Sequence, residues 1–515
     1  MLGSDLLRGI IRRRLRIGLL AAPVAGLAIA LAAAGGAAAS AAAAPASAGT
    51  VAHAPALPKL GIWTAVSAGQ TVEAGNPALW VAPNGAGWDV YERQIAANNF
   101  TYEAVQIAPS GKVTHGPSDI FAIHWGSLQF APTLLGDGGK PLLIFDGGRG
   151  SSGPYSDGCV YGALGGPSTW TLEPWSLSFN CGNPLSEAAE SNSNAKVLGT
   201  AWPGGWAGGS GINYRIGVSA TIPATGDDKH IALFPATAAP AGMINDEVGN
   251  GHFYVAWAQQ NSTPVGRDGI YVKDVTANGP ARKAPGTGTA SSDTDFPVFG
   301  RLATVNRNVK GGGVYLAYCA NKSPCSLELW KVGAAKAIAV PSSADAFGVS
   351  LAQGPAGRIW AAWYNASSNR VFVARTNKAA TRFGVVRSYP TPCFEQGLLG
   401  LGGSPLAKLD IGMQCVNNAQ AKSEQFVTQV LAGLTVGAPG TVHVGSRGTS
   451  VTITATDAGD PVAGATVKVA GKTARTNAAG RAVISLSAST KLGSYKVTVI
   501  APAYATATAS LVVKR

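Results

Sequence analysis

The side chains best placed to do chemistry in this sequence are a few charged residues next to glycine. Four short segments, FDGGRG, YSDGC, INDEVG and RDG, supply Asp146, Arg149, Asp157, Glu247, Arg267 and Asp268. Two carboxyl groups that flank a glycosidic bond, one protonated and one ionised, can hydrolyse that bond. The reaction depends on the distance between the two carboxyl groups in space, so the sequence identifies candidates but not which two of them form a pair. Capping of turns by Asp is the structural alternative for each acidic residue.

Aromatic side chains form a second group of candidates, which suits binding better than bond cleavage. The glycine-rich segment AWPGGWAGGSGINY contains Trp202, Trp206 and Tyr214. An aromatic face offers apolar contact to a sugar ring, while nearby amides and backbone groups reach its hydroxyls. Packing inside the fold is the alternative for these rings. Together, the candidates favour binding of an extracellular polymer, carbohydrate first, over catalysis.

Other reaction classes lack the residues that they need. DGGRG has no Lys followed by Ser or Thr, as a phosphate-binding P-loop requires, and no G-x-S-x-G elbow supports a serine hydrolase. The six His are dispersed and no C-x-x-C spacing occurs, so we expect no metal and no cofactor. No basic cluster is interleaved with stacking aromatics, so we expect no nucleic-acid partner.

Residues 1–48 have the features of a secretory signal peptide. Arginines crowd residues 8–16, an apolar segment covers residues 17–34, and Ala-Ser-Ala at 46–48 forms a small-x-small cleavage site. We therefore expect export, with residues 49–62 as a linker and a location outside the cell or at its surface. An uncleaved N-terminal membrane anchor is the alternative, because the apolar segment approaches the length of a bilayer span.

The six cysteines fit an oxidising compartment. A preference for short loops pairs Cys159 with Cys181, Cys319 with Cys325, and Cys393 with Cys415, although six cysteines allow 15 pairings. A metal site is the rival use of cysteine, but no His lies close to any of them in the sequence. We therefore expect three local disulfides.

A recurring segment predicts the fold. RIWAAW, ending at Trp363, matches GVYLAY, HFYVAW and KPLLIF, and weaker copies are VLGTAW, GWDVY and LDIGM. The copies recur about every 45 to 61 residues, near the length of a propeller blade. Most follow a glycine-containing turn, such as VGNG, and precede a polar loop and a second strand. We expect an all-β protein with a six- or seven-bladed β-propeller over residues 63–435 and aromatic side chains packed between the blades.

Two alternatives to seven blades stay open. A six-bladed ring would treat AAESNSNAKVLG as an irregular insertion. A pair of β-sandwiches is also an all-β solution, but it would leave the regular spacing of the aromatic segments unexplained.

The expected propeller resembles the bacterial sialidase-like superfamily in its secretion, its meander blades and its appended module. Sialidase blades carry an Asp-box turn, S-x-D-x-G-x-T-W. GGPSTW keeps Thr169 and Trp170 of this turn, but Gly165 replaces the Asp and Pro167 replaces the Gly. Spacing does not select an arginine triad from the candidates Arg93, Arg149, Arg215 and Arg267. The resemblance implies a shape, with sialidase-like glycoside hydrolysis as the alternative to binding and a protein-interaction scaffold as a third hypothesis.

Residues 436–515 lack Trp and Cys and differ in character from the rest of the chain. GDPVAGATVKVAGKTARTNAAGRAVISL resembles bacterial immunoglobulin-like and carboxypeptidase-regulatory-like modules. The matching residues are Pro461, Gly464, Ala465, Thr476, Asn477, Gly480 and Ala482. The resemblance implies a small β-sandwich with a spacer, stalk or surface-binding role and no catalytic residues.

Charge is concentrated in the same C-terminal region. It contains nine Lys or Arg but only Asp457 and Asp460 as acidic residues. A basic module on an exported protein suits anionic polymers of a cell surface, and a generic solubilising surface is the alternative. We therefore expect an extracellular polysaccharide or a cell-wall polymer as the partner.

Overall fold

The structure is a computed structural model of the chain, and it describes the following residues: 62–67, 77–96, 99–120, 132–137, 139–146, 160–166, 169–177, 190–194, 197–206, 209–218, 229–232, 244–259, 268–287, 302–320, 325–365, 367–393, 396–403, 408–417 and 422–515. The predicted signal peptide lies outside these residues. Lys59–Arg515 form one compact unit.

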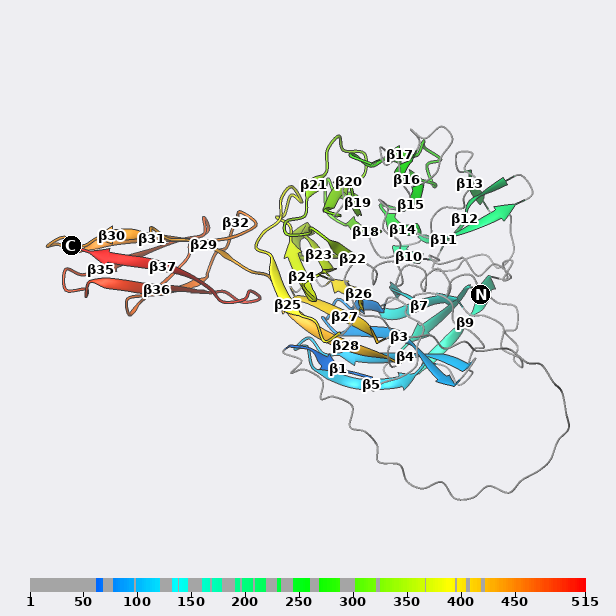
Figure 1. The fold of residues 1–515 in the computed structure, drawn as a ribbon, viewed down its shortest axis with the longest axis horizontal. Coiled ribbons are helices and arrows are strands. Elements are labelled where there is room, and N and C mark those ends of the chain that lie inside the picture. Colours follow the sequence, from blue (N-terminus) through cyan, green and yellow to red (C-terminus); the bar gives the residue numbers. More distant parts are fainter. Residues whose placement is uncertain are drawn as a thin grey trace, which may run out of the picture. The chain divides into compact units, whose positions relative to one another are not determined.

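The described residues form an all-β structure without an α-helix (Figure 1). Their helical content is the short 3-10 turn Pro355–Gly357. Seven four-stranded sheets are built from strands between Thr64 and Leu431, and two further sheets lie between Thr435 and Lys514. Within each of the seven sheets, every pair of neighbouring strands is antiparallel, as in a meander.

The first three sheets cover residues 78–232. The first contains β2 (Ala78–Val81), β3 (Gly87–Ala96), β4 (Asn99–Ile107) and β5 (Val113–Asp119). The second contains β6 (Thr133–Asp137), β7 (Lys140–Asp146), β8 (Val160–Gly165) and β9 (Trp170–Leu177). The third contains β10 (Glu190–Asn194), β11 (Val197–Trp206), β12 (Gly209–Val218) and β13 (Lys229–Ala232).

The next three sheets cover residues 244–390. The fourth contains β14 (Ile244–Gly249), β15 (His252–Gln259), β16 (Gly269–Asp274) and β17 (Arg282–Lys283). The fifth contains β18 (Leu302–Arg307), β19 (Gly313–Cys319), β20 (Leu327–Lys331) and β21 (Ile338–Ala339). The sixth contains β22 (Ala346–Gln353), β23 (Ile359–Asn365), β24 (Arg370–Arg375) and β25 (Arg387–Pro390).

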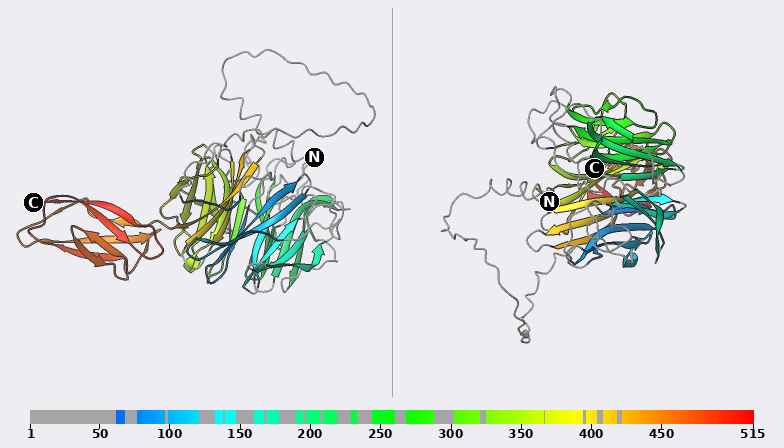
Figure 2. Two further views of the ribbon diagram at one scale, coloured as in Figure 1. Left: turned by 90° about the horizontal axis from the view of Figure 1, so that it is seen from below. Right: turned by 90° about the vertical axis from the view of Figure 1, so that its right-hand side faces the viewer.

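The seventh sheet joins the two ends of this series. It contains β26 (Gln396–Gly403), β27 (Lys408–Asn417), β28 (Lys422–Leu431) and, paired with β28, β1 (Thr64–Ala65). The first strand of each sheet contacts the first strand of the next, and β26 contacts β2, so the seven sheets form a closed cycle (Figures 1 and 2). The outer strand of the last sheet, β1, comes from the start of the chain, so its pairing with β28 holds the two ends of the cycle together.

The seven recurring sequence segments are the second strands of the seven sheets. They lie in β3, β7, β11, β15, β19, β23 and β27. AAESNSNAKVLG supplies β10 and the first residues of β11, so it takes part in the third sheet instead of interrupting the series.

The recurring aromatic side chains fill the space between neighbouring sheets, as predicted. Trp257, Tyr318 and Trp363 occupy corresponding places in β15, β19 and β23, and each is at most 2% exposed. Each belongs to a hydrophobic cluster shared with the preceding sheet; Trp363, for example, clusters with Tyr315 and Leu329 of the fifth sheet. Burial of these large rings removes apolar area from water and so holds neighbouring sheets together.

One of the predicted turns shows how the sequence directs the chain between strands. Asn250 and Gly251 connect β14 to β15 with φ angles of 54° and 79°. Asn and Gly adopt this left-handed conformation more readily than other residues do. Positive φ at both positions of a two-residue hairpin matches the twist of the flanking strands. The VGNG segment therefore encodes a tight hairpin.

The C-terminal region contains two sheets around one apolar core. One consists of β29 (Thr435–Gly437), β31 (Thr449–Asp457), β32 (Asp460–Pro461) and β35 (Arg481–Leu486). The other consists of β30 (Thr441–His443), β37 (Ala507–Lys514), β36 (Gly493–Ile500), β33 (Thr466–Val469) and β34 (Lys472–Arg475). Alternate residues point into the core, including Val467, Ile484 and Val497.

Thr476 and Asn477, two residues of the sequence motif in this region, have a structural role. Thr476 Oγ1 accepts a hydrogen bond from the backbone N of Ala465 at 2.8 Å and donates one to the backbone O of Val462 at 2.7 Å. Asn477 Oδ1 accepts from the backbone N of Arg481 at 3.1 Å. These bonds fix the chain between β32 and β35, since buried backbone groups need such partners.

Candidate functional site

Three of the candidate residues lie at one edge of the cycle of sheets. Because the seven sheets are meanders of the same order, their connections between second and third strands fall on the same side. Asp146 ends β7, Trp206 ends β11, and Asp268 directly precedes β16, so the three belong to consecutive sheets. We call this side of the cycle the loop edge.

Several other candidates are only partly described. Outside the described residues lie Arg149, Asp157 and Arg267. The backbone, but not the side chain, is described for Asp146, Trp202 and Trp206. Trp202 lies inside β11 and not at its end. The binding roles of these residues stay predictions.

Three candidates with described side chains are buried. Tyr214 is 6% exposed, clusters with Trp257, and has a pKa raised above its ordinary value by burial. Glu247 lies inside β14, where its Oε1 accepts a hydrogen bond from the backbone N of Val248 at 3.0 Å. Asp268 is 5% exposed. Tyr214 and Glu247 thus lie within strands, whereas Asp268 lies at the loop edge.

Two of the three predicted disulfides are present, and both lie at the loop edge. Cys319 ends β19 and bonds to Cys325, which precedes β20. Cys393 precedes β26 and bonds to Cys415 near the end of β27. The predicted pair Cys159 and Cys181 lies outside the described residues. A disulfide restricts the unfolded chain, so these two bonds favour the folded connections at this edge.

Arg93, one of the arginines considered for a triad, forms its ion pair within the first sheet. Its guanidinium group pairs with Glu103 of β4, and Tyr91 donates to the other carboxylate oxygen of Glu103 at 2.8 Å. Arg215 lies in β12. The described residues therefore do not gather an arginine triad.

Two buried carboxyl groups lie where the first and seventh sheets meet. Asp89 in β3 is 0% exposed and Asp410 in β27 is 2% exposed. Each carboxyl group lies against a glycine of the opposite strand. A Cβ atom added at Gly412 would collide with Asp89 Oδ1, and one added at Gly87 would come 2.9 Å from Asp410 Oδ2. The two glycines therefore leave the space that the two carboxyl groups occupy.

Glutamines of β28 bind both carboxyl groups. Gln425 Nε2 donates to Asp89 Oδ2 at 2.7 Å, and Gln429 Nε2 donates to Asp410 Oδ1 at 2.8 Å. Burial raises the pKa of Asp89 to about 8 against the opposing effect of the Gln425 hydrogen bond, and it raises the pKa of Asp410 to about 6. Asp89 is therefore largely protonated at neutral pH. Because each group is hydrogen-bonded to a glutamine of β28 and lies against a glycine of the facing sheet, we assign both to the joint between the sheets and not to ligand binding.

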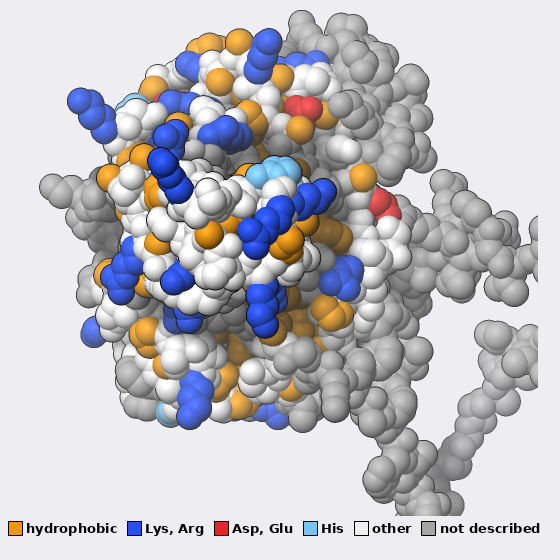
Figure 3. Space-filling model, turned by 90° about the vertical axis from the view of Figure 1, so that its left-hand side faces the viewer, with side chains coloured by type: hydrophobic (Ala, Val, Ile, Leu, Met, Phe, Trp, Pro, Cys, Tyr) orange, Lys and Arg blue, Asp and Glu red, His pale blue; other side chains and the backbone are white. Residues whose placement is uncertain are grey.

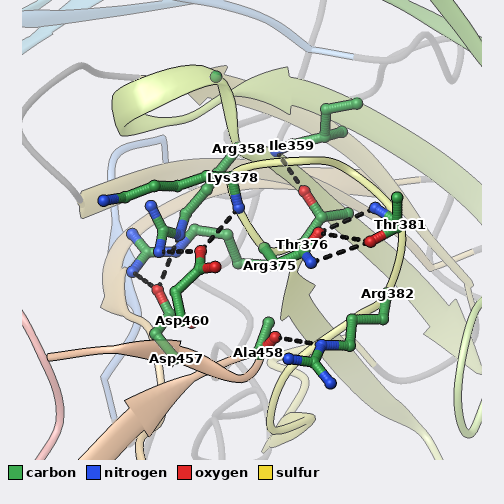
Figure 4. Close-up of polar contacts among 12 residues, drawn as sticks. Arg358, Ile359, Arg375, Thr376, Lys378, Thr381, Arg382, Asp457, Ala458 and Asp460 are labelled. Atoms are coloured by element: carbon green, nitrogen blue, oxygen red, sulfur yellow. Dashed lines mark hydrogen bonds and ion pairs between the residues drawn. The ribbon is translucent and has the colours of Figure 1, made fainter. Parts of the chain in front are cut away.

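A buried ion cluster joins the sixth sheet to the C-terminal sheets (Figure 4). Arg375 Nη2 of β24 lies 2.6 Å from Asp457 Oδ2 at the end of β31, and Arg358 Nε lies 3.0 Å from the same oxygen. Arg358 Nη2 also donates to Asp460 Oδ2 at 2.6 Å. The side chains of Asp457 and both arginines are at most 6% exposed.

Aromatic rings enclose the same cluster. The guanidinium carbon of Arg375 lies 4.8 Å from the ring centroid of Trp360 and 5.3 Å from that of Tyr504. The hydroxyl of Tyr504 donates to Asp457 Oδ2 at 3.2 Å. Cation–π attraction strengthens when the cation is removed from water. Arg375 thus connects a ring of the sixth sheet to a ring of the C-terminal region.

The ion cluster determines which charges the C-terminal region shows to solvent. Its acidic side chains are Asp457 and Asp460, and both pair with Arg358, which directly precedes β23 of the sixth sheet. Its basic residues are all exposed: Arg447, Lys468, Lys472, Arg475, Arg481, Lys491, Lys496, Lys514 and Arg515. On the face in Figure 3, Lys and Arg side chains are spread widely and acidic side chains are few. This charge balance favours anionic partners.

Neither buried polar cluster was predicted from the sequence. A signal for the first exists in GWD and DIG, where an Asp stands two residues from a Gly in a recurring strand and alternation turns it inward. No comparable signal marks the arginines, because Arg375 is 82 residues from Asp457 in the chain.

No protein-family model matches the chain, and no curated protein matches it. Among solved structures, it is similar to a polysaccharide lyase, Uly1, with 11% identity and a TM-score of 0.42 over 74% of this chain and 94% of the other. It is also similar to the Hadza microbial sialidase Hz136, with 10% identity and a TM-score of 0.34 over 56% of this chain and 63% of the other. A third similar structure is a GH43_1 enzyme from Xanthomonas citri, with 12% identity and a TM-score of 0.31 over 72% of this chain and 91% of the other. These similarities are too distant to assign a family or an activity.

Two further properties of the described residues bear on cofactors and location. They contain no group of three or more His, Cys, Asp or Glu side chains that could hold a metal ion. No helix among them combines the length and the apolar character that crossing a membrane requires. The two disulfides are consistent with an extracellular protein.

Proposed function

We propose that this chain is a secreted, cell-envelope-associated protein that binds an extracellular polymer, carbohydrate first. In this proposal the seven sheets are the blades of a seven-bladed β-propeller, and the C-terminal region is an immunoglobulin-like module. The closed cycle of four-stranded sheets supports the first assignment, and two sheets around one core support the second. The predicted signal peptide and the two disulfides support export.

The observation that carries the binding proposal is the placement of Asp146, Trp206 and Asp268. These three residues come from consecutive sheets and lie on the same side of the cycle. An indole face and carboxyl groups supply the apolar contact and the hydrogen-bond acceptors that sugar recognition uses. The disulfides at the same edge favour a fixed arrangement of its connections, which lowers the entropic cost of binding.

Binding at the loop edge can be tested with a glycan array and matched variants. Trp206→Ala and Asp268→Asn should each weaken binding to the glycans that the unaltered protein retains. Asp274→Asn is the control, because Asp274 ends β16 on the opposite edge of the same sheet. Circular dichroism and melting temperatures establish that the variants are folded. Uniform absence of glycan binding, or equal losses at Asp268 and Asp274, would contradict the proposal.

Sialidase-like glycoside hydrolysis is the second candidate function. Asp146 and Asp268 favour it, because two carboxyl groups from different sheets belong to the same edge. Turnover of fluorogenic glycosides, lost in Asp146→Asn and Asp268→Asn, would replace the binding proposal with this one.

A scaffold for protein partners has less support. The exposed large apolar residues among those described come from separate places in the chain: Ile62, Val309, Val385, Val483, Leu492 and Ile500. Single exposed apolar side chains are ordinary on protein surfaces, whereas a docking face needs a contiguous patch.

A further inference from the structure

The outer face of the five-stranded C-terminal sheet carries a diagonal row of cations. Arg475, Lys468, Lys496 and Lys514 lie on β34, β33, β36 and β37, which are neighbours in this order. All four side chains are exposed, while the residues that alternate with them along the strands face the core. We call these four residues the cationic stripe.

The strand register fixes the direction of the stripe. Arg475 pairs with Thr466, which is two residues before Lys468 in β33. Lys468 pairs with Thr498, which is two residues after Lys496 in β36. Each step along the stripe therefore moves one strand sideways and two residues along the strand. Neighbouring cations are thus about 8 Å apart at Cα in these two steps.

The last step continues in the same direction. Lys496 pairs with Ser510, and Lys514 lies four residues further along β37. From Arg475 to Lys514, the stripe spans about 30 Å, estimated from the spacing between strands and the rise along them. This footprint is long and narrow, as a linear chain of negative charges requires.

Hydroxyl groups stand beside the cations of the stripe. Thr473 and Thr498 are the cross-strand neighbours of Lys468, and Ser510 is the cross-strand neighbour of Lys496. Directly paired residues project from the same face of a sheet. A hydroxyl can both donate to a carboxylate and accept from a sugar hydroxyl. The stripe therefore offers charge and neutral hydrogen bonds side by side.

From this arrangement we propose that the cationic stripe is a docking site for a linear acidic polysaccharide whose charges are carboxylates. The row of hydroxyls favours a sugar polymer, which presents many hydroxyls of its own. The outward positions of β33, β34, β36 and β37 hold no aromatic ring on which bases of single-stranded nucleic acid could stack. Their apolar members, Ile500 and Val512, do not form the broad apolar face that membrane binding needs.

No acidic side chain of the C-terminal region stands beside the stripe to offset this charge. The carboxylates of Asp457 and Asp460 face the sixth sheet, where Arg358 and Arg375 hold them. An exposed row of cations attracts a polyanion. This attraction weakens as salt is added, because mobile ions screen the charges. The stripe is distinct from the loop edge, so this inference stands whether or not the loop edge binds a glycan.

The test measures binding of the purified protein to immobilised polygalacturonate, with neutral dextran as the blank. We expect binding to polygalacturonate that falls as salt rises, and none to dextran. Lys468→Gln with Lys496→Gln should weaken binding about tenfold. Lys468→Arg with Lys496→Arg should retain it, since the charges are kept.

A matched control removes the same charge from elsewhere in the same region. Arg481 lies on the other sheet and Arg447 lies in the chain before β31, so Arg447→Gln with Arg481→Gln should change binding less than twofold. Equal losses in the two double variants would overturn the site, because net charge would then explain the binding. Absence of polygalacturonate binding would also overturn it, as would tighter binding to phosphatidylglycerol vesicles or duplex DNA. A loss of polygalacturonate binding in Trp206→Ala as large as that in the lysine double variant would place the ligand at the loop edge and so overturn the stripe.

Discussion

The carboxylate of Asp457 lies 2.6 Å from the Nη2 atom of Arg375, and both side chains are only 1% exposed. The Nε atom of Arg358 lies 3.0 Å from the same oxygen of Asp457. The buried carboxylate of Asp457 therefore contacts two buried guanidinium groups, and for Arg375 it is the carboxylate partner, whereas Arg358 also pairs with Asp460. Removing one partner of a buried pair leaves the other charge without compensation, which is strongly destabilising.

Asp457→Asn should accordingly lower the free energy of unfolding by about 3 kcal/mol. The amide keeps the shape of the side chain but removes the charge that offsets Arg358 and Arg375. Urea unfolding followed by tryptophan fluorescence measures this change, and Trp360 lies against Arg375, close to the affected contact.

Asp460→Asn is the control for the Asp457 substitution. The Asp460 side chain is 21% exposed and pairs with Arg358, which keeps Asp457 as a partner. We expect a loss of less than about 1 kcal/mol, as is usual for pairs that solvent reaches. Equal losses for the two variants would show that Asp457 has no special place in the cluster.

The buried carboxyl pair predicts that the protein is more stable in mild acid than in mild base. Burial raises the folded-state pKa of Asp89 from 3.8 to about 8, so the folded protein keeps a proton that the unfolded chain releases. The resulting stability is complete below about pH 4 and is lost as the pH rises toward 8. Burial also raises the pKa of Asp410, to about 6, so its contribution to stability has the same sign and is lost as the pH rises toward 6.

Asp89→Asn should therefore flatten the dependence of unfolding free energy on pH between 5 and 9, and it should stabilise the protein most at the alkaline end. The change reaches a few kcal/mol, since each unit of pKa shift corresponds to about 1.4 kcal/mol. Asp345→Asn, at a half-exposed position, is the control and should leave the slope unchanged. Parallel curves for Asp89→Asn and the unaltered protein would contradict the assignment.

The glycine opposite Asp89 gives a steric prediction. In Gly412→Ala the new methyl group meets Asp89 Oδ1, and neighbouring groups must shift. Overpacking of this kind costs about 1–3 kcal/mol. Gly279→Ala is the control, because nothing lies within 4 Å of a Cβ atom there. In an Asp89→Ala background the cost of Gly412→Ala should largely disappear, and a double-mutant cycle by thermal unfolding measures this coupling.

The all-β class and the second strand of every sheet could be predicted from the sequence because both depend on local signals. Segments such as RIWAAW join aromatic and β-branched residues to glycine turns, and a strand that is buried on both faces requires this composition. The hairpin at Asn250 and Gly251 is local in the same sense. The choice between six and seven units depended on VLGTAW, GWDVY and LDIGM, which match the recurring segment less well than the other copies do.

The buried polar contacts could not be predicted because their partners meet only when the sheets assemble. Asp89 is hydrogen-bonded to Gln425, which is 336 residues away in the chain. The sequence around either residue does not indicate that the other is its partner. At the candidate site, the order of strands explains why Asp146, Trp206 and Asp268 belong to one edge. Spacing in the sequence could not distinguish them from Tyr214 and Glu247, which lie inside strands.

The two disulfides should contribute unequally to stability, in the order set by the loops that they close. Cys319 and Cys325 are 6 residues apart in sequence, and Cys393 and Cys415 are 22 apart. Chain entropy then gives about 2 kcal/mol for the first bond and about 3 kcal/mol for the second. Paired Cys→Ser variants, compared by urea unfolding, should lose stability in this order, with the greater loss for Cys393→Ser with Cys415→Ser. The reverse order would mean that packing around the sulfur atoms, and not restriction of the unfolded chain, determines what these bonds contribute at the loop edge.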